Sequence, residues 1–156
     1  MIYVAFLRGI NVGGNAKVPM SDLKKAFEEL GYSNVKTLLN SGNVIFDTKE
    51  PEPQILTQEI ENKLTQSFGF EVSVIVRTQK EIQELIHSKP FADTKTGSDI
   101  RLYVTFLPES PFQVFSVVDL SAEGTTGLMK ELEKKHGKKI TTRNWNTILR
   151  LAATTP

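Results

Sequence analysis

The stretch that decides the fold is IYVAFLRGINVGGNAKVPMSDLKKAFEELG, residues 2–31. Residues 2–7 are apolar on both alternations, as expected of a central β-strand that is covered on both faces. A loop rich in glycine and asparagine follows, and then a predicted helix with Ser21 as its N-cap and Gly31 as its C-terminal stop. Three apolar residues share one stripe of that helix: Leu23, Phe27 and Leu30. A strand, a loop and a helix in this order can hold a phosphate group, so the same stretch raises a question of function.

Downstream of this stretch, the elements follow in the order of a ferredoxin-like unit. Residues 35–40 and 43–48 are predicted strands, joined by the short link Ser41-Gly42. A long amphipathic helix comes next, because its apolar residues lie four apart: Leu56, Ile60, Leu64 and Phe68. Residues 71–78 alternate and are rich in β-branched residues, which predicts another strand. The resulting order, βαββαβ, is typical of a split ferredoxin-like unit.

An echo within the chain predicts an internal duplication. The segment YVAFLRG at residues 3–9 is similar to YVTFLPE at residues 103–109, and self-similarity of this kind marks repeated units. We therefore expect an α+β fold made of two ferredoxin-like (βαββα-type) halves, residues 1–70 and 71–156. The second half is expected to be reduced, since residues 108–127 contain no clean hairpin pattern, and to end in a C-terminal helix.

The C-terminal part of the chain is basic. It is predicted to form a helix over residues 125–137, a strand over residues 138–142 and a terminal helix over residues 144–153. Seven of the chain's 19 basic residues, but only two of its 18 acidic residues, lie between Lys130 and Arg150. Such a segment on an otherwise acidic chain indicates either an anionic partner, such as nucleic acid, or a solvated helix face.

The composition is that of a soluble globular protein, with 39% hydrophobic and 24% charged residues. The absence of cysteine excludes disulfides, thiolate metal sites and cysteine nucleophiles. His87 and His136 have no partner at metal-ligand spacing, so we expect no metal and no cofactor. No apolar run approaches the ~18 residues of a membrane-spanning helix, and the N-terminus lacks a basic leader. We therefore expect a cytoplasmic protein without a membrane partner.

The glycine loop resembles a nucleotide-binding P-loop only in part. Gly9 and Gly14 have the separation of the first two glycines in G-x-x-x-x-G-K-[ST]. Asn15 and Ala16 then stand where that motif needs lysine and a hydroxyl residue, and lysine arrives one position late, at Lys17. The loop is not G-x-G-x-x-G either, so a Rossmann dinucleotide turn is unsupported. A nucleotide triphosphatase is thereby disfavoured.

A simpler anion cradle is compatible with the same loop. Gly13, Gly14 and Asn15 adopt positive φ at low cost, so that successive amides can point into one concavity. Arg8 and Lys17 would flank that concavity with positive charge. The alternative is a plain strand-to-helix connection, in which glycine relieves strain and the asparagine side chains, those of Asn11 and Asn15, bond to backbone.

A second polar motif, TTRNWNT at residues 141–147, precedes the last predicted helix. Asn144 is the natural N-cap, which would leave Arg143 beside the free amides of the first turn, where anions are favoured. Trp145 would either stack on a planar ligand or anchor the helix in the core. Its position on the apolar stripe of the helix favours the core.

Three segments together resemble the signature of a bacterial family, the domain-of-unknown-function family 1697: FLRGINVGGNAKVPMSDL (residues 6–23), LNSGNVIF (39–46) and TTRNWNTILRLA (141–152). The resemblance spans nearly the whole chain and implies a cytoplasmic α+β protein made of two ferredoxin-like halves. It implies no activity, because the family is uncharacterised. The family pattern has a longer segment between the FLPE and TTRNW motifs than this chain has, which again predicts a reduced second half.

We predict a binding module with one polar pocket for a small anionic ligand that is phosphate- or nucleotide-like. The pocket lining is predicted to come from both motifs: Arg8, Asn11, Gly13, Gly14, Asn15, Lys17, Arg143, Asn144 and Trp145. This requires the first and last motifs to meet in space. The alternatives are a nucleic-acid-binding protein that uses the segment Lys130–Arg150, and an enzyme acting on a phosphorylated substrate, for which the sequence offers no base or nucleophile.

Overall fold

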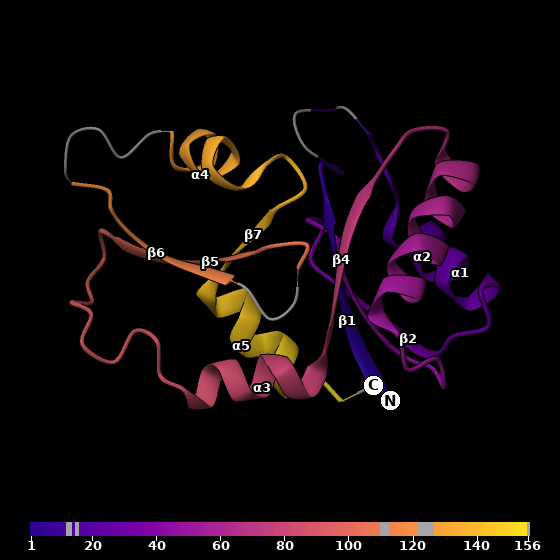
Figure 1. The fold of residues 1–156 in the computed structure, drawn as a ribbon, viewed down its shortest axis with the longest axis horizontal. Helices are drawn as coiled ribbons and strands as arrows, with labels where there is room; N and C mark the ends of the chain where they lie inside the picture. The colour runs from indigo at the N-terminus through magenta and orange to yellow at the C-terminus, as the bar shows by residue number, and fades with distance from the viewer. Residues whose placement is uncertain (12–13, 15, 110–112, 122–126, 156) are drawn as a thin grey trace.

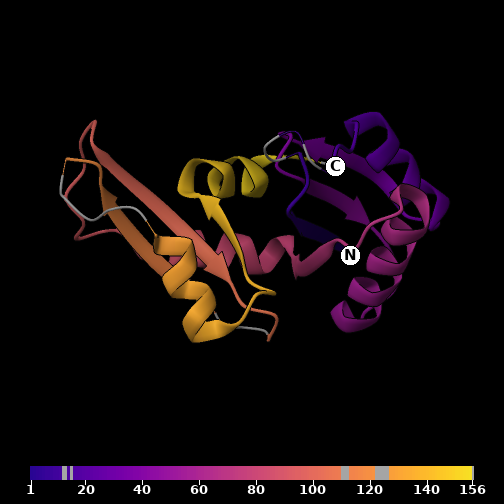
Figure 2. The same cartoon turned by 90° about the horizontal axis from the view of Figure 1, so that it is seen from above.

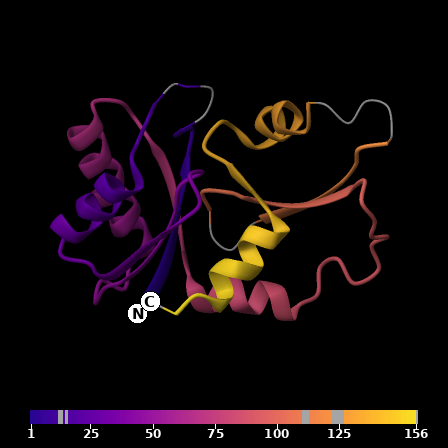
Figure 3. The same ribbon diagram turned by 180° about the vertical axis from the view of Figure 1, so that it is seen from behind.

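The structure, a computed structural model, describes residues 1–11, 14, 16–109, 113–121 and 127–155. Within these residues the chain is a mixed α+β fold with five helices and two antiparallel sheets, one of four strands and one of three (Figure 1). The N and C labels lie close together in the views of Figures 1 and 3, and the view from above separates them (Figure 2). No described helix is both long and apolar enough to cross a membrane.

The first sheet has the strand order β2-β3-β1-β4, with every neighbouring pair antiparallel. Its strands are β1 (Ile2–Arg8), β2 (Ser33–Leu38), β3 (Asn43–Asp47) and β4 (Ser73–Thr78). Helices α1 (Met20–Glu29) and α2 (Pro53–Phe68) cover its outer face (Figure 1). The five residues from Tyr3 to Leu7 are buried, so the prediction of a central strand covered on both faces is confirmed. The βαββαβ order of this part is also the one predicted.

The boundaries of α1 agree with the prediction at one end only. The helix begins at Met20 from an extended Pro19, so Ser21 lies in its first turn and the prediction that Ser21 is the N-cap is wrong. Proline at this place holds a fixed φ and its carbonyl accepts from the amides of Asp22 and Leu23, which starts the helix without a side-chain cap. Gly31 takes the left-handed conformation after the helix, as predicted.

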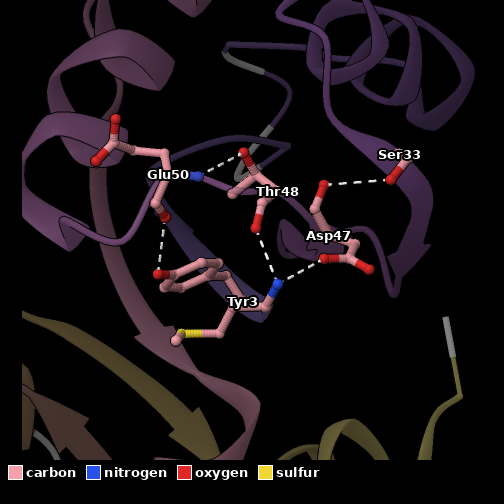
Figure 4. A network of polar contacts seen from close by, with 6 residues as sticks. Tyr3, Ser33, Asp47, Thr48 and Glu50 are labelled. Atoms are coloured by element: carbon pink, nitrogen blue, oxygen red, sulfur yellow. Dashed lines mark hydrogen bonds and ion pairs between the residues drawn. The ribbon is translucent and has the colours of Figure 1, made fainter.

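The start of β1 forms polar contacts with the end of β3 and with the segment that follows it (Figure 4). The amino group of Met1 donates to Asp47 Oδ1 at 2.8 Å and to the Thr48 carbonyl at 2.9 Å. The Tyr3 hydroxyl donates to the Glu50 carbonyl at 2.9 Å, and burial raises the pKa of this hydroxyl. These bonds lie next to the first residue pair of the register of β1 with β3, Ile2 opposite Asp47. Arg8 lies at the opposite end of β1.

The second sheet has the order β6-β5-β7 and is also antiparallel. Its strands are β5 (Ile100–Phe106), β6 (Gln113–Asp119) and β7 (Thr141–Asn144). Helices α3 (Gln79–His87) and α5 (Trp145–Ala153) lie side by side on one of its faces, and α4 (Leu128–His136) lies on the other (Figures 1 and 3). A single core of ten buried residues joins both sheets to α3 and α5.

Two C-terminal boundaries differ from the prediction, and one strand was not predicted. The last strand runs over residues 141–144 rather than 138–142, and α4 begins at Leu128 after Gly127 in the left-handed conformation. Strand β6 lies in the stretch 108–127, where no hairpin was predicted. Its core, VFSVV, has apolar residues on both faces and lacks the alternation that marks a half-buried strand.

The two sheets are interlocked by two arginines that occupy matching positions. Arg77 of β4 is the partner of Val4 in the register with β1, and Arg143 of β7 is the partner of Val104 in the register with β5. Each guanidinium crosses to the other sheet: Arg77 Nη2 donates to the Leu107 carbonyl, and Arg143 Nη2 donates to the Leu7 carbonyl. Leu7 and Leu107 are themselves matched in the YVAFL and YVTFL echo.

The echoed segments form the central strand of each sheet. Phe6 and Phe106, which are matched in the echo, stack with their ring centroids 4.5 Å apart. Among the described residues, the second sheet has no counterpart of α1 and β2. The ferredoxin-like duplication stays a prediction. So does the division into residues 1–70 and 71–156, although β4, which follows residue 70, pairs with β1 in the first sheet.

Candidate functional site

A cleft of about 750 Å³ lies between the end of β1 and the face of the second sheet that carries α4. One wall is formed by residues 7–10, and the other by Gly127, which precedes α4, and by the first turn of α4. The floor includes Tyr103 of β5 and residues 141–144 of β7. Both Arg8 and Arg143 line this cleft. The first and last sequence motifs therefore meet in space, as the single-pocket hypothesis requires.

Arg143 makes the contact between the motifs. Its side chain is 8% exposed, and its Nη2 donates to the carbonyls of Leu7, Ser41 and Gly42. Its Nε donates to Asn43 Oδ1 at 2.6 Å, and its Nη1 donates to Thr141 Oγ1 at 2.7 Å. The guanidinium group also lies over the Phe6 ring, 5.5 Å from its centroid. Arg143 thus ties β7 to the end of β1 and to the link between β2 and β3.

Among the described residues, no carboxylate pairs with the charge of Arg143. Burial lowers the pKa of its guanidinium to about 10, so the group stays protonated at neutral pH. Its acceptors are carbonyl, amide and hydroxyl oxygens, and none of the ion pairs between described residues includes it. A full positive charge therefore lies under the floor of the cleft, in a medium that screens it poorly.

Arg8 lies on the wall of the cleft and is half-buried. Its Nη2 forms an ion pair with Glu133 of α4. Its Nη1 donates to the carbonyl of Ile140 at 3.2 Å and to that of Lys138. Arg8 thereby connects the carboxyl end of β1 with α4 and with the turn that follows it. An arginine in this position already binds one carboxylate, that of Glu133.

The residues of the glycine loop lie in a different place. Asn11, Gly14 and Lys17 line a separate depression of about 370 Å³ beside the start of α1. The Asn11 side chain donates to the carbonyls of Val18 and Asn40 and accepts from the Val18 amide at 2.8 Å. These bonds fit the alternative in which asparagine closes the loop through backbone contacts. Gly13 and Asn15, which were also predicted to line the pocket, lie outside the described residues.

The two remaining predicted residues have different surroundings. Asn144 lines the cleft and caps α5, as predicted, by accepting from the Asn146 amide at 2.9 Å. Trp145 is half-buried and packs edge-on against Phe91, with the ring centroids 5.0 Å apart. Its ring belongs to the border of the core between the sheets, so the structure favours the anchoring role over stacking on a ligand.

The apolar part of the cleft was not predicted. It consists of side chains from β5, β6, the residue after β6, and α4: Tyr103, Val118, Leu120, Leu128 and Met129. These residues are distant in sequence and have no common spacing, so no sequence pattern could group them. A polar contact is present among them, because the Thr142 hydroxyl lies 2.7 Å from Thr105 Oγ1 and 2.9 Å from Met129 Sδ.

Within the described ranges, no three side chains of His, Asp or Glu are grouped so that they could hold a metal ion. His87 ends α3 and His136 ends α4, so the two histidines belong to different helices.

Comparison with known proteins identifies a family and a similar fold for the chain, but no activity. A family model described as "Protein of unknown function (DUF1697)" matches residues 1–136, a range that ends before the TTRNWNT motif. No curated protein matches the chain. Among solved structures, the conserved bacterial protein SP0830 from Streptococcus pneumoniae is similar, with a TM-score of 0.76 and 21% sequence identity. That likeness covers 97% of this chain and 96% of the other, and at this identity it shows the fold alone.

Proposed function

Because the chain belongs to DUF1697, a family of proteins of unknown function, its role has to be argued from its own residues, and we propose that it is a binding module for a small anionic ligand. The observation that carries this proposal is the charge of Arg143, which is buried under the cleft and has no carboxylate partner among the described residues. A buried cation beside a cleft with low-dielectric walls focuses positive potential into the cleft and attracts anions.

Arg8 supports an anionic group in the ligand. Its guanidinium lies on the wall of the cleft and pairs with the carboxylate of Glu133. Guanidinium groups bind carboxylate and phosphate oxygens with the same planar donor geometry. A ligand phosphate or carboxylate would therefore replace Glu133 on Arg8, and Glu133 would turn to solvent. Lys130, which also lines the cleft and is exposed, adds a further positive charge.

The apolar wall supports a ligand with an apolar body. Tyr103 and Met129 line the cleft together with Val118, Leu120 and Leu128. A volume of about 750 Å³ lies within the range of about 300–1,000 Å³ that is usual for small-molecule sites. A free inorganic phosphate would leave most of the apolar wall of the cleft in contact with water. The cleft is therefore better suited to a nucleotide-like molecule, which combines an aromatic base with an anionic group.

A thermal-shift screen tests the proposal. The panel contains AMP, GMP, glucose 6-phosphate and inorganic phosphate, with adenosine, guanosine and glucose as neutral counterparts. A ligand at one hundred times its Kd stabilises the folded state by about 2.7 kcal/mol, which raises Tm by roughly 5–10 °C in a chain of this size. We expect such a shift with a phosphorylated compound and a much smaller one with its neutral counterpart.

Two variants assign that shift to the cleft. Arg8→Ala should weaken binding by about tenfold or more, since a hydrogen-bonded charge contact contributes about 1.5–3 kcal/mol. Lys134→Ala removes the same charge from an exposed position of α4 that does not line the cleft, and should leave affinity unchanged. If both variants bind as tightly as the wild-type protein, the site is elsewhere. Release of inorganic phosphate by the wild-type protein, lost in Arg8→Ala, would instead identify an enzyme acting on a phosphorylated substrate.

Nucleic acid is the second candidate ligand, because five exposed lysines follow one another along α4 and the turn after it: Lys130, Lys134, Lys135, Lys138 and Lys139. Arg143 does not add to this surface, since it is buried. Binding through these lysines would weaken steeply as salt is raised. Affinity for a short single-stranded oligonucleotide that is equal at 50 and 200 mM salt would exclude this candidate.

A further inference from the structure

Among the described residues, β6 is an edge strand, and no strand in the second sheet corresponds to β2 of the first sheet. Within the described ranges, β6 pairs with β5 alone. The matched arginines make β7 the counterpart of β4, because Arg77 and Arg143 occupy the same register positions beside β1 and β5. Since β1 lies between β3 and β4 while β5 lies between β6 and β7, β6 is the counterpart of β3. The outer edge of β3 carries β2 in antiparallel pairing.

Among the described residues, β6 lacks three features that commonly protect an exposed edge strand. Exposed edges are usually interrupted by lysine, by proline or by a bulge. The edge strand β2 has two of these features: an exposed Lys36, and an irregular register between Ser33 and Lys36. Strand β6 pairs with β5 in unbroken register along all seven residues, and it has no charged residue before Asp119.

Two large apolar side chains of β6 remain exposed on the face shared with Val104. Phe115 is 38% exposed and Val117 is 49% exposed, and each lies opposite an apolar residue of β5 in the register. They would be covered by side chains of a strand added to the β6 edge, because residues that lie opposite each other in neighbouring strands share a face.

The sequence of β6, QVFSVVD, is complementary to itself in the antiparallel direction. When two copies pair about Ser116, Val114 faces Val118, Phe115 faces Val117, and Gln113 faces Asp119. In this register each exposed Phe115 lies beside the exposed Val117 of the second copy, and the carboxylate of Asp119 faces an amide rather than another carboxylate. A shift of the register by an even number of residues would break this match, and an odd shift would place apolar side chains on the opposite face.

We propose that β6 is the dimerisation edge of this protein, at which a second copy of the chain adds its own β6 in antiparallel orientation. The two three-stranded sheets then form one continuous six-stranded sheet with a twofold axis at Ser116. An isologous contact of this kind closes on itself and forms no fibre. The contact is small compared with that of obligate dimers, so association is expected in the micromolar range.

Sedimentation velocity of the full chain from about 1 to 200 µM tests the proposal. The weight-average mass should rise with concentration from that of one chain toward that of two, and stop there. Val117→Lys should hold the protein monomeric over this range, because it places a charge on the pairing edge. Ile55→Lys, which changes an equally exposed residue of α2 (45% against 49% exposed), should dimerise like the wild-type protein. Far-UV circular dichroism and Tm confirm that both variants are folded.

A charge-swap experiment tests the register. Ser116 faces its own copy on the proposed axis, so Ser116→Lys and Ser116→Asp should each be monomeric, and mixing them in equal amounts should restore the dimer. A wild-type protein that stays monomeric at 200 µM would overturn the proposal and leave the edge to a strand of a different protein. A dimer that persists in Val117→Lys, or that is not restored by mixing the Ser116 variants, would overturn the assignment to β6.

Discussion

Arg143 is the residue on which three separate segments of the chain converge: the end of β1, the link after β2, and β7. Its five nitrogen-bound protons are directed at the carbonyls of Leu7 and Gly42, at Asn43 Oδ1 and at neighbouring oxygens. The planar fork of a guanidinium can satisfy such a set of acceptors at once, whereas an ammonium group cannot. The charge that is proposed to attract a ligand to the cleft therefore belongs to a residue that also joins these segments.

Arg143→Lys should lower the free energy of unfolding by about 3 kcal/mol, because several buried acceptors lose their donors. Urea denaturation followed by circular dichroism measures the loss. The matched control is Arg77→Lys, in which an equally buried arginine that donates to the carbonyls of Val76 and Leu107 is changed, and a smaller loss is expected. A loss below about 1 kcal/mol in Arg143→Lys would show that these contacts of Arg143 are dispensable.

Gly42 is required by space as well as by conformation. It has φ +89°, and a Cβ at this residue would lie 2.8 Å from Ile10 Cδ1 and 2.9 Å from Leu7 Cβ. Gly42→Ala should therefore cost about 3 kcal/mol, from overpacking and left-handed strain together. Gly31→Ala, at the same φ but with open space around the added methyl group, should cost about 1 kcal/mol from strain alone. Equal losses in the two variants, measured by urea denaturation, would contradict the packing argument.

At the scale of elements, α4 is the least anchored part of the cleft. Leu132 is its one buried residue among those described, and glycines with positive φ, Gly127 and Gly137, flank it on both sides. The ion pair between Glu133 and Arg8 holds it against the end of β1. A ligand bound to Arg8 as proposed would compete with this ion pair, which is one of the contacts of α4.

Glu133→Gln should raise the affinity for a phosphorylated ligand about two- to fivefold, because the ligand no longer competes with an internal carboxylate whose pairing contributes up to ~1 kcal/mol. Isothermal titration calorimetry measures the change. Glu131→Gln removes the same charge from an exposed position of the same helix and is the matched control. If the two variants gain affinity equally, the effect is one of net charge and the competition is absent.

The elements near the N-terminus could be predicted because each has a strong local pattern. Residues 2–7 have the uniformly apolar composition of a central strand, and Leu56, Ile60 and Leu64 have the helical spacing of residues that are indeed buried. Strand β6 could not be predicted in this way. Half-exposed apolar residues such as Phe115 and Val117 conceal the alternation, so the same property that makes β6 a candidate for dimerisation removed its signal from the sequence.

The candidate site, too, could be predicted from the sequence only in part. Arg8, Arg143 and Asn144 could be selected as polar residues at the end of a strand and at the start of a helix, and all three line one cleft. Asn11 and Lys17 could not be excluded from it, because the backbone bonds that close the glycine loop are formed with Val18 and Asn40 and have no sequence signature. The apolar wall depends on tertiary packing between α4 and the second sheet, which no local pattern contains.

For the molecule as a whole, one core connects the two sheets. Val4 and Phe6 of the first sheet pack with Val104 and Phe106 of the second, and Ile148 of α5 belongs to the same cluster. The sheets should therefore unfold together. Trp145, the one tryptophan of the chain, reports on α5, while far-UV circular dichroism reports on the whole chain. We expect the two urea midpoints to coincide, and a separation beyond experimental error would show that the halves unfold independently.

We have proposed that the cleft between β1 and the second sheet binds a small anion. A ¹⁵N–¹H correlation spectrum of the wild-type protein, titrated with AMP and inorganic phosphate and, as the neutral control, with adenosine, tests it most directly. We expect saturable shifts of the amides that line the cleft, among them those of Tyr103, Met129 and Thr142, with phosphorylated compounds and much weaker shifts with adenosine. Shifts that are absent with both anions, or that are confined to residues outside the cleft, would show that the cleft is not an anion site.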